Sequence, residues 1–203
     1  MKKYKLILFD LDGVIIDSKT NMEKSWSAVQ VAFEIDVPFE KYFELIGHPF
    51  NEIVSKLGLS NLSKGIKLVY DVVSSCRIDL VKTYDGIIEV IKLIKQRGIR
   101  IGLVTSKDET RTLEIVKKIN ILFDVIECPD ESKRGKPYPD QILRAILKCQ
   151  ADPIETLYVG DMEVDRECAK RAGIDYIHAG WGYGTSNSEI LRASKPSDIV
   201  NII

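Results

Sequence analysis

The sequence predicts an α/β protein with a doubly wound, mostly parallel, Rossmann-like sheet core and an all-helical cap domain inserted after the first strand. Two observations predict the core: short, near-continuous apolar runs recur along the chain, and segments with helical periodicity lie between them. Continuous apolar runs are typical of parallel strands covered on both faces. Alternation of strand and helix is typical of a doubly wound sheet. The third observation, a long stretch with helical patterns alone, predicts the cap.

The elements of the core can be placed in chain order. Runs rich in Ile, Leu and Val predict strands at residues 6–9, 99–105, 123–128, 156–161 and 174–179. Apolar residues three and four positions apart predict the helices between them, at residues 86–98, 108–120, 139–150 and 164–173.

The predicted cap is the segment 19–81, which contains helical patterns such as NMEKSWSAVQVAFE and GIKLVYDVVSSCRIDLV. Residues 1–18 and 82–203 are then the predicted catalytic core. An insert of this kind requires two connecting segments between the parts, which we expect near residues 17–20 and 81–86. Relative motion of the two parts is the default expectation for such an arrangement.

Composition excludes several classes of partner. The 203 residues are 45% hydrophobic, and 29 Lys+Arg balance 30 Asp+Glu, so we expect no nucleic-acid partner. Asp10 interrupts the first apolar run too early for a signal peptide, and no apolar run has membrane-spanning length. The four cysteines show no CxxC spacing, which favours free thiols. We therefore expect a cytoplasmic protein that is a monomer or a weak dimer, without a membrane partner.

Polar residues gather where the predicted strands end. In open α/β sheets, ligands bind beyond the carboxyl ends of the strands. The residues at or shortly after these ends are Asp10, Asp12, Thr105, Ser106, Lys107, Asp161 and Asp165. A further lysine, Lys136, lies in the Gly/Pro-rich loop before the helix predicted at residues 139–150. A phosphate monoester and a carboxylate nucleophile are both anions, so their reaction needs a cation. Clustered carboxylates can hold Mg²⁺, and a lysine and a hydroxyl can orient phosphoryl oxygens.

Four segments, DLDGVIIDS, LVTSK, GKPYPD and VGDMEVD, stand in the order and context of the four motifs of the haloacid dehalogenase-like (HAD) superfamily. The chain resembles this superfamily over almost its whole length. It looks most like the phosphoglycolate phosphatase/β-phosphoglucomutase-like branch, which carries a helical cap between the first and second motifs. The resemblance implies a Mg²⁺-dependent phosphatase that hydrolyses a small-molecule phosphate monoester, a sugar phosphate or a phosphoglycolate-like compound, through an aspartyl-phosphate intermediate.

The matching motif positions imply specific roles. Asp10 resembles the nucleophile, and Asp12 resembles the general acid that protonates the leaving oxygen and then activates water as a base. Placement two residues apart at a strand end lets the two carboxyl groups take different environments. Thr105 resembles the phosphate binder of the second motif, with Ser106 as a helper, and Lys136 resembles the lysine of the third motif.

The same resemblance implies the metal ligands. Asp161 looks like a direct Mg²⁺ ligand beside Asp10 and the main-chain carbonyl of Asp12. Asp165 is expected to support the metal, directly or through water.

The cap loop LIGHPFNEI is the candidate for substrate selection, because loops of this kind face the active site in related capped enzymes. We therefore expect His48, Phe50 and Asn51 to contact the substrate. No Arg lies between Ser18 and Cys76, which disfavours a highly charged distal group on the substrate. Three further residues are interpreted as surface or structural: Lys107, Asp108 and Asp17.

Two alternatives to the phosphatase stay open at this point. Phosphosugar mutases of the same branch also keep the second Asp, but their pattern has a His on the first cap helix and an Arg in the cap loop, where this chain has Met22 and Phe50. A receiver-type phospho-acceptor domain, which belongs to another class, shares an acidic cluster, a hydroxyl and a lysine, but is shorter and has no helical insert. Dehalogenation is disfavoured by Asp12, because dehalogenases of this fold lack the second Asp.

Overall fold

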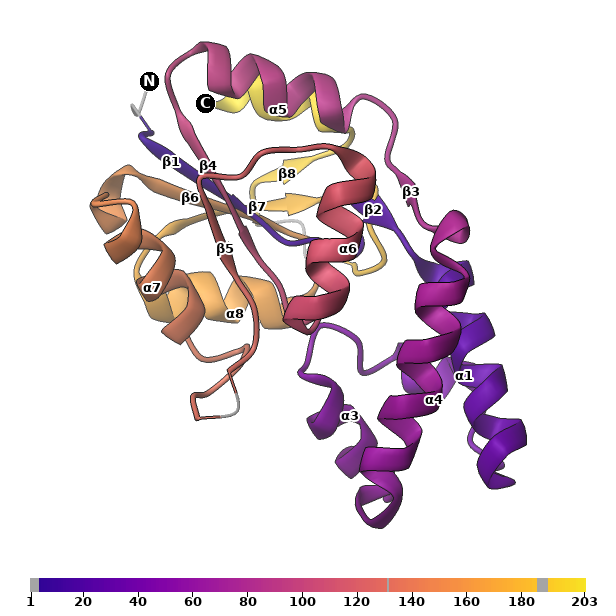
Figure 1. Cartoon of the computed structure of the whole chain (residues 1–203). Helices are drawn as coiled ribbons and strands as arrows, with labels where there is room; N and C mark the ends of the chain where they lie inside the picture. The colour runs from indigo at the N-terminus through magenta and orange to yellow at the C-terminus, as the bar shows by residue number, and fades with distance from the viewer. Residues whose placement is uncertain (1–3, 131, 186–189) are drawn as a thin grey trace.

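A six-stranded parallel sheet forms the centre of the molecule in a computed structural model that describes residues 4–130, 132–185 and 190–203 (Figure 1). The strand order is β5-β4-β1-β6-β7-β8. The strands are β1 (Leu6–Phe9), β4 (Arg100–Val104), β5 (Val125–Glu127), β6 (Thr156–Gly160), β7 (Asp175–Ala179) and β8 (Arg192–Ala193). The chain runs outward from β1 to β4 and β5, then returns to the other side of β1 for β6. The strand order therefore reverses beside β1, which is where ligands bind in such sheets.

Helices cover both faces of this sheet. On one face lie α5 (Ile87–Gln96), α6 (Glu109–Ile119) and α9 (Ile199–Ile202), and on the other lie α7 (Asp140–Lys148) and α8 (Glu163–Ala172). Side chains of β1 alternate between the two buried clusters, with Ile7 and Phe9 in the first cluster and Leu6 and Leu8 in the second. Burial on both faces explains why the strand is apolar throughout, and the predicted doubly wound α/β core is confirmed.

The core elements that were not predicted from the sequence include β8 and α9. The two-residue strand β8 and the four-residue helix α9 are too short to show a period of their own. Strand β8 extends the sheet beside β7, with His178 paired to Arg192 and Ala179 to Ala193. Short edge strands of this kind are defined by the neighbour that they pair with, so local sequence carries little signal for them.

The segment 19–81, called the helical insert below, contains α1 (Lys19–Phe33), α2 (Phe39–Phe43), α3 (Phe50–Lys56) and α4 (Ser63–Cys76). These helices bury a third apolar cluster, which includes the fully buried Trp26. The Trp26 ring stacks on Tyr42 with 4.6 Å between centroids, and its Nε1 donates to the Val37 carbonyl at 2.8 Å. In Figure 1, α1, α3 and α4 lie together at one end of the sheet.

A short antiparallel ribbon joins the helical insert to the rest of the chain. Strand β2 (Ile16–Asp17) leads into α1, and β3 (Lys82–Thr83) leads back out of the insert. Ile16 pairs with Thr83 and Asp17 pairs with Lys82, so the outgoing and returning strands are bound side by side.

The longest described helix is α1, with 15 residues. In the part of the chain that the structure describes, no helix is long and apolar enough to cross a lipid bilayer.

Trp26→Ala tests whether the insert depends on its own buried cluster. Removing this fully buried indole should lower the free energy of unfolding by about 3–5 kcal/mol. Trp26→Phe keeps an aromatic ring but loses the bond to Val37, so we expect a smaller loss of about 1–2 kcal/mol. Urea unfolding followed by circular dichroism measures both. A loss below about 1 kcal/mol for Trp26→Ala would show that the cluster is not what holds the insert together.

Candidate active site

The predicted site residues meet at the carboxyl ends of three neighbouring strands. Asp10 directly follows β1, Thr105 follows β4 and Asp161 follows β6. Because these parallel strands are paired, their carboxyl ends lie at one edge of the sheet. A cavity at this edge is lined on one side by core residues, including Asp10 and Asp12, and on the other by residues of the helical insert, including Tyr42 and Tyr70.

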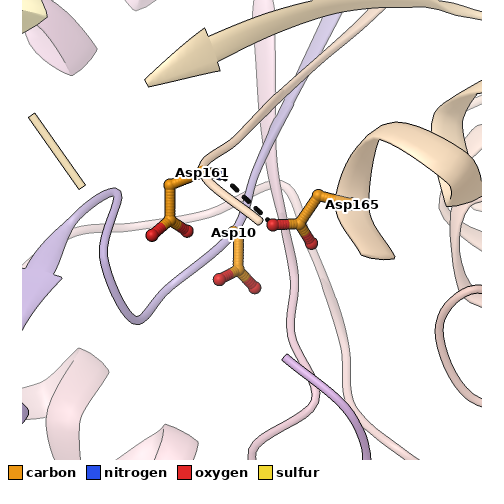
Figure 2. Close-up of side chains that lie close together, drawn as sticks. All are labelled: Asp10, Asp161 and Asp165. Carbon is orange, nitrogen blue, oxygen red and sulfur yellow. Dashed lines mark hydrogen bonds between the residues drawn. The ribbon is translucent and has the colours of Figure 1, made fainter. Parts of the chain in front are cut away.

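Three buried carboxylates form the centre of the site. Asp10, Asp161 and Asp165 each offer one oxygen within 4.8 Å of the others (Figure 2). Burial is the main cause that raises the pKa of Asp10 to about 7, and repulsion by Asp165 adds to it, against the opposing effect of Lys136. Burial raises the pKa of Asp161 well above its usual range, and repulsion by Asp165 and Asp10 adds to this increase. The site is therefore short of positive charge.

Asp161 has an oxygen that is available to a ligand. Its Oδ2 accepts a hydrogen bond from the Tyr183 backbone N at 2.7 Å. Its Oδ1 is buried and has no hydrogen-bond partner among the described residues. An orphaned carboxylate oxygen beside a second buried carboxylate fits a hard divalent cation, which prefers oxygen ligands. The residues present thus suit a metal ion held by Asp10 and Asp161.

Lys136 supplies the counter-charge inside the protein. Its side chain is 1% exposed, and its Nζ donates to Asp10 Oδ1 at 2.7 Å and to Asp165 Oδ1 at 2.8 Å. Burial lowers the pKa of this ammonium, but attraction to the two carboxylates outweighs burial and raises it above its ordinary value. Lys136 is therefore charged, and it reaches the site from the loop before α7.

Asp165 is occupied by donors on both oxygens. Its Oδ1 accepts from Lys136 and from the Tyr158 hydroxyl at 3.1 Å. Its Oδ2 accepts from the backbone N of Asp161 at 3.2 Å, drawn as a dashed line in Figure 2, and from the backbone N of Met162 at 3.0 Å. With four donors in place, this carboxylate holds the loop that carries Asp161 and orients Lys136.

Asp12 lies in a different environment from Asp10. Its Oδ1 accepts a short hydrogen bond from the Ser18 hydroxyl, and its Oδ2 lies 3.2 Å from Lys107 Nζ. Lys107 was interpreted as a surface or structural residue. It is not a surface residue, because its side chain is only 9% exposed and lines the cavity. Burial lowers the pKa of Lys107, while Asp12 opposes that change. The two adjacent acids thus have separate cationic partners.

Gly13 allows the chain to turn between these two acids and β2. Its φ of +85° lies in the left-handed region, and an added Cβ would lie 2.2 Å from Asp161 Oδ2. Both backbone conformation and space therefore require glycine directly after Asp12.

The residues after β4 line the cavity in two different ways. Thr105 is buried, and its Oγ1 accepts from the Lys107 backbone N at 3.1 Å. Ser106 Oγ donates to the Gly47 carbonyl of the helical insert at 2.6 Å. The Ser106 hydroxyl proton is therefore directed at the insert, whereas the Thr105 hydroxyl proton has no acceptor among the described residues.

The predicted specificity residues are not all brought to the cavity. His48 and Phe50 line it. Asn51 does not: its side chain is exposed and its Oδ1 accepts from Ser63 Oγ at 3.2 Å. Helix α3 begins at Phe50, so the next residue points to another side of the helix. The position of Asn51 does not support the expected substrate contact.

Sequence reasoning missed Arg111, which lies in the first turn of α6 and lines the cavity. Asp108, interpreted as surface or structural, caps this helix by accepting from the Arg111 backbone N at 3.1 Å. Asp17, interpreted in the same way, accepts from the Tyr183 hydroxyl at 2.9 Å. The available signal for Arg111 was its place in the first turn of the predicted helix that follows a strand end at the ligand-binding edge.

Comparisons with known proteins identify a family for this chain. The family model for haloacid dehalogenase-like hydrolases matches residues 7–179. Pyrophosphatase PpaX of Bacillus mycoides is 27% identical over 203 residues, covering 98% of this chain and 93% of that protein. Phosphoglycolate phosphatase of Aquifex aeolicus is 27% identical over 209 residues, covering 98% and 96%.

Solved structures share the fold. A haloacid dehalogenase-like family hydrolase from Streptococcus pneumoniae superposes with a TM-score of 0.87 at 21% identity, covering 100% of this chain and 99% of that one. The family match spans β1 to β7 and includes every acidic residue of the site. With its parallel sheet and its buried acidic cluster at the strand ends, the chain belongs to the haloacid dehalogenase-like hydrolase family.

Proposed function

We propose that the protein is a Mg²⁺-dependent phosphatase that hydrolyses a small-molecule phosphate monoester through an aspartyl-phosphate on Asp10. The observation that carries this proposal is the pairing of two acids with two separate lysines: Asp10 with Lys136, and Asp12 with Lys107. Such separation suits two carboxyl groups with different tasks. The relatives named as a pyrophosphatase and a phosphoglycolate phosphatase agree with a reaction that releases phosphate.

In the first half of the reaction, a carboxylate oxygen of Asp10 attacks the phosphorus atom and the ester oxygen leaves. Lys136 Nζ, already 2.7 Å from Asp10, offsets negative charge that gathers on the phosphoryl group. The Thr105 hydroxyl can donate to a phosphoryl oxygen, because its Oγ1 serves only as acceptor for Lys107 N in the described part of the chain. Ser106 lies beside it, and its hydroxyl would have to leave the Gly47 carbonyl to assist.

Asp12 transfers protons in both halves of the reaction. It protonates the leaving oxygen in the first half. In the second half it takes a proton from the water that attacks the phosphorus of the aspartyl-phosphate, so that the bond between the Asp10 oxygen and phosphorus breaks and inorganic phosphate leaves. Its bonds to Ser18 and Lys107 hold the carboxyl group at the wall of the cavity that also contains Asp10.

The metal would be held by Asp10 and Asp161, with the Asp12 main-chain carbonyl as a third protein ligand. When bound, Mg²⁺ supplies positive charge that reduces repulsion between the phosphate ester and the carboxylates. Asp165 supports this site from behind, because both of its oxygens are engaged by Lys136, Tyr158 and backbone N–H groups. Direct coordination by Asp165 would require the loss of at least one of these bonds.

The helical insert would act as a cap that excludes water and selects the substrate. Two observations support this role: Ser106 Oγ donates a hydrogen bond to the Gly47 carbonyl, and Gly47 lies so close to Val164 that an added Cβ would be 2.7 Å from the Val164 side chain. The insert therefore rests directly on the loop after β4 and on the start of α8. His48 and Phe50 line the cavity from the insert side and are its proposed substrate contacts.

A phosphatase is favoured over a phosphosugar mutase by the cavity wall. Met22 and Phe50 line the cavity at the places where the mutase pattern has a His and an Arg. Neither side chain can donate a hydrogen bond, so the contacts that the His and the Arg make in the mutase pattern are missing at these two places. A receiver-type phospho-acceptor is disfavoured by the match to the hydrolase family over residues 7–179.

Substitution of the two acids tests the proposed division of labour. Asp10→Asn removes the nucleophile, and Asp12→Asn removes the acid and base, so each should lower kcat on a phosphate monoester about a hundredfold or more. Asp79→Asn, which changes an exposed acid in the insert, is the charge-matched control and should keep the wild-type rate. Steady-state phosphate release measures all three. Normal turnover by Asp10→Asn would rule out covalent catalysis at this residue.

The pH dependence of metal binding follows from the buried acids. The pKa of Asp10 rises from about 3.8 in the unfolded chain to about 7 in the folded, metal-free protein. Folding without metal is therefore favoured below about pH 4 and loses that contribution as pH rises through 7, where the buried carboxyl must ionise. Mg²⁺ binds the ionised form, so it should raise the melting temperature more at pH 8 than at pH 5.

Thermal melts with and without Mg²⁺ check this prediction. Asp161→Asn is the matched variant, because it removes a proposed ligand and should lose most of the Mg²⁺-induced shift at pH 8. Equal shifts at both pH values, or an undiminished shift in Asp161→Asn, would contradict a metal site at Asp10 and Asp161.

A further inference from the structure

One buried cation of the cavity has no part in the reaction described above. Arg111 lies in the first turn of α6, its side chain is 6% exposed, and it lines the same cavity as Asp10 and Asp12. Asp10 already has Lys136 as its cationic partner, and Asp12 has Lys107. Arg111 is therefore a positive charge beyond those that neutralise the two catalytic acids.

The internal partner of Arg111 is a weak one. Its Nη1 lies 3.7 Å from Asp71 Oδ1 on α4, which is longer than a hydrogen bond. The other oxygen of Asp71 lies 2.5 Å from Lys67 Nζ, so the charge of Asp71 is already balanced by a closer cation. A guanidinium has five N–H donors, and a buried charge without hydrogen-bonded partners is costly. Among the described residues, Arg111 thus has no anionic partner within hydrogen-bond distance.

The surroundings hold the guanidinium in place. Its carbon lies 5.5 Å from the centroid of the Tyr70 ring, within the range of a cation–π contact. The Tyr70 hydroxyl is fixed in turn by a 2.9 Å hydrogen bond with Tyr42, and both tyrosines line the cavity. Packing against a buried aromatic pair limits the positions open to the Arg111 side chain.

We propose that Arg111 is a specificity-determining residue that binds a second anionic group of the substrate, a carboxylate or a second phosphate carried by the leaving group. The guanidinium fork binds either group through paired N–H donors. This inference rests on the proposed phosphatase function and narrows its substrates to phosphate compounds with two anionic ends.

The proposal changes one expectation drawn from the sequence. The absence of Arg between Ser18 and Cys76 disfavoured a charged distal group, because the cap was expected to supply the contacts. In the structure the cation comes from the core helix α6 instead, and the insert contributes the aromatic and acidic side chains around it.

Arg111→Met tests the proposal on three substrates with Mg²⁺: phosphoglycolate, pyrophosphate and ethyl phosphate. Phosphoglycolate carries a distal carboxylate, pyrophosphate a second phosphate, and ethyl phosphate no second anion. The measured ratio is kcat/KM for the better of the two substrates with a second anion, divided by kcat/KM for ethyl phosphate. In Arg111→Met we expect this ratio to fall about 30-fold or more, mainly because KM for the substrate with a second anion rises. Arg97→Met removes an exposed cation that bonds to the Val200 carbonyl, and it should leave the ratio unchanged.

Asp71→Asn separates substrate binding from a purely structural role. Removing this carboxylate takes away the internal competitor for Arg111, so the same ratio should rise. If Arg111 only joined α6 to α4, Arg111→Met and Asp71→Asn would instead lower the rates on all three substrates by similar factors, and that result would overturn the proposal.

The outcomes distinguish this inference from the proposed function. Failure of the wild-type protein to hydrolyse any of the three compounds with Mg²⁺ would count against the phosphatase itself. Hydrolysis of ethyl phosphate with an unchanged ratio in Arg111→Met would leave the phosphatase standing and refute the role of Arg111. Comparison of phosphoglycolate with pyrophosphate shows which anionic group the residue prefers.

Discussion

The site depends on the two ion pairs that the buried Lys136 ammonium forms with Asp10 and Asp165. The ammonium lies between Asp10 Oδ1 and Asp165 Oδ1, at 2.7 and 2.8 Å, in a place that also contains Asp161. Three buried carboxylates would repel one another without a cation, and loss of one member of a buried ion pair commonly costs about 3–5 kcal/mol. Lys136 therefore allows the acids to gather, while leaving enough uncompensated charge to attract a metal ion.

The same contacts connect the separate parts of the chain. Lys136 comes from the loop before α7, and Asp165 binds the backbone at Asp161 and Met162 from α8. The insert rests on this framework through the bond between Ser106 and Gly47. Chemistry and metal binding would thus share one edge of the sheet. The proposed substrate contacts come from both sides of the cavity, His48 and Phe50 from the helical insert and Arg111 from the core helix α6.

Much of this arrangement could be predicted from the sequence, because parallel strands place the residues that follow them at one edge. That rule brought Asp10 and Asp161 together, and the roles of the site residues stay predictions. The rule does not predict which way a side chain points, or which residues of the core and the insert face each other across the cavity. Lys107 was therefore interpreted as a surface or structural residue although it lines the cavity. Arg111 was missed, and Asn51 was expected to contact the substrate although it does not line the cavity.

The central claim is that a phosphoryl group passes through Asp10. Acid quenching during turnover, followed by mass spectrometry of the proteolytic peptides, tests it most directly. We predict one phosphoryl group on the peptide that contains Asp10, lost on treatment with hydroxylamine as expected for an acyl phosphate. Steady turnover with no phosphorylated peptide, or with phosphate on another residue, would contradict the account.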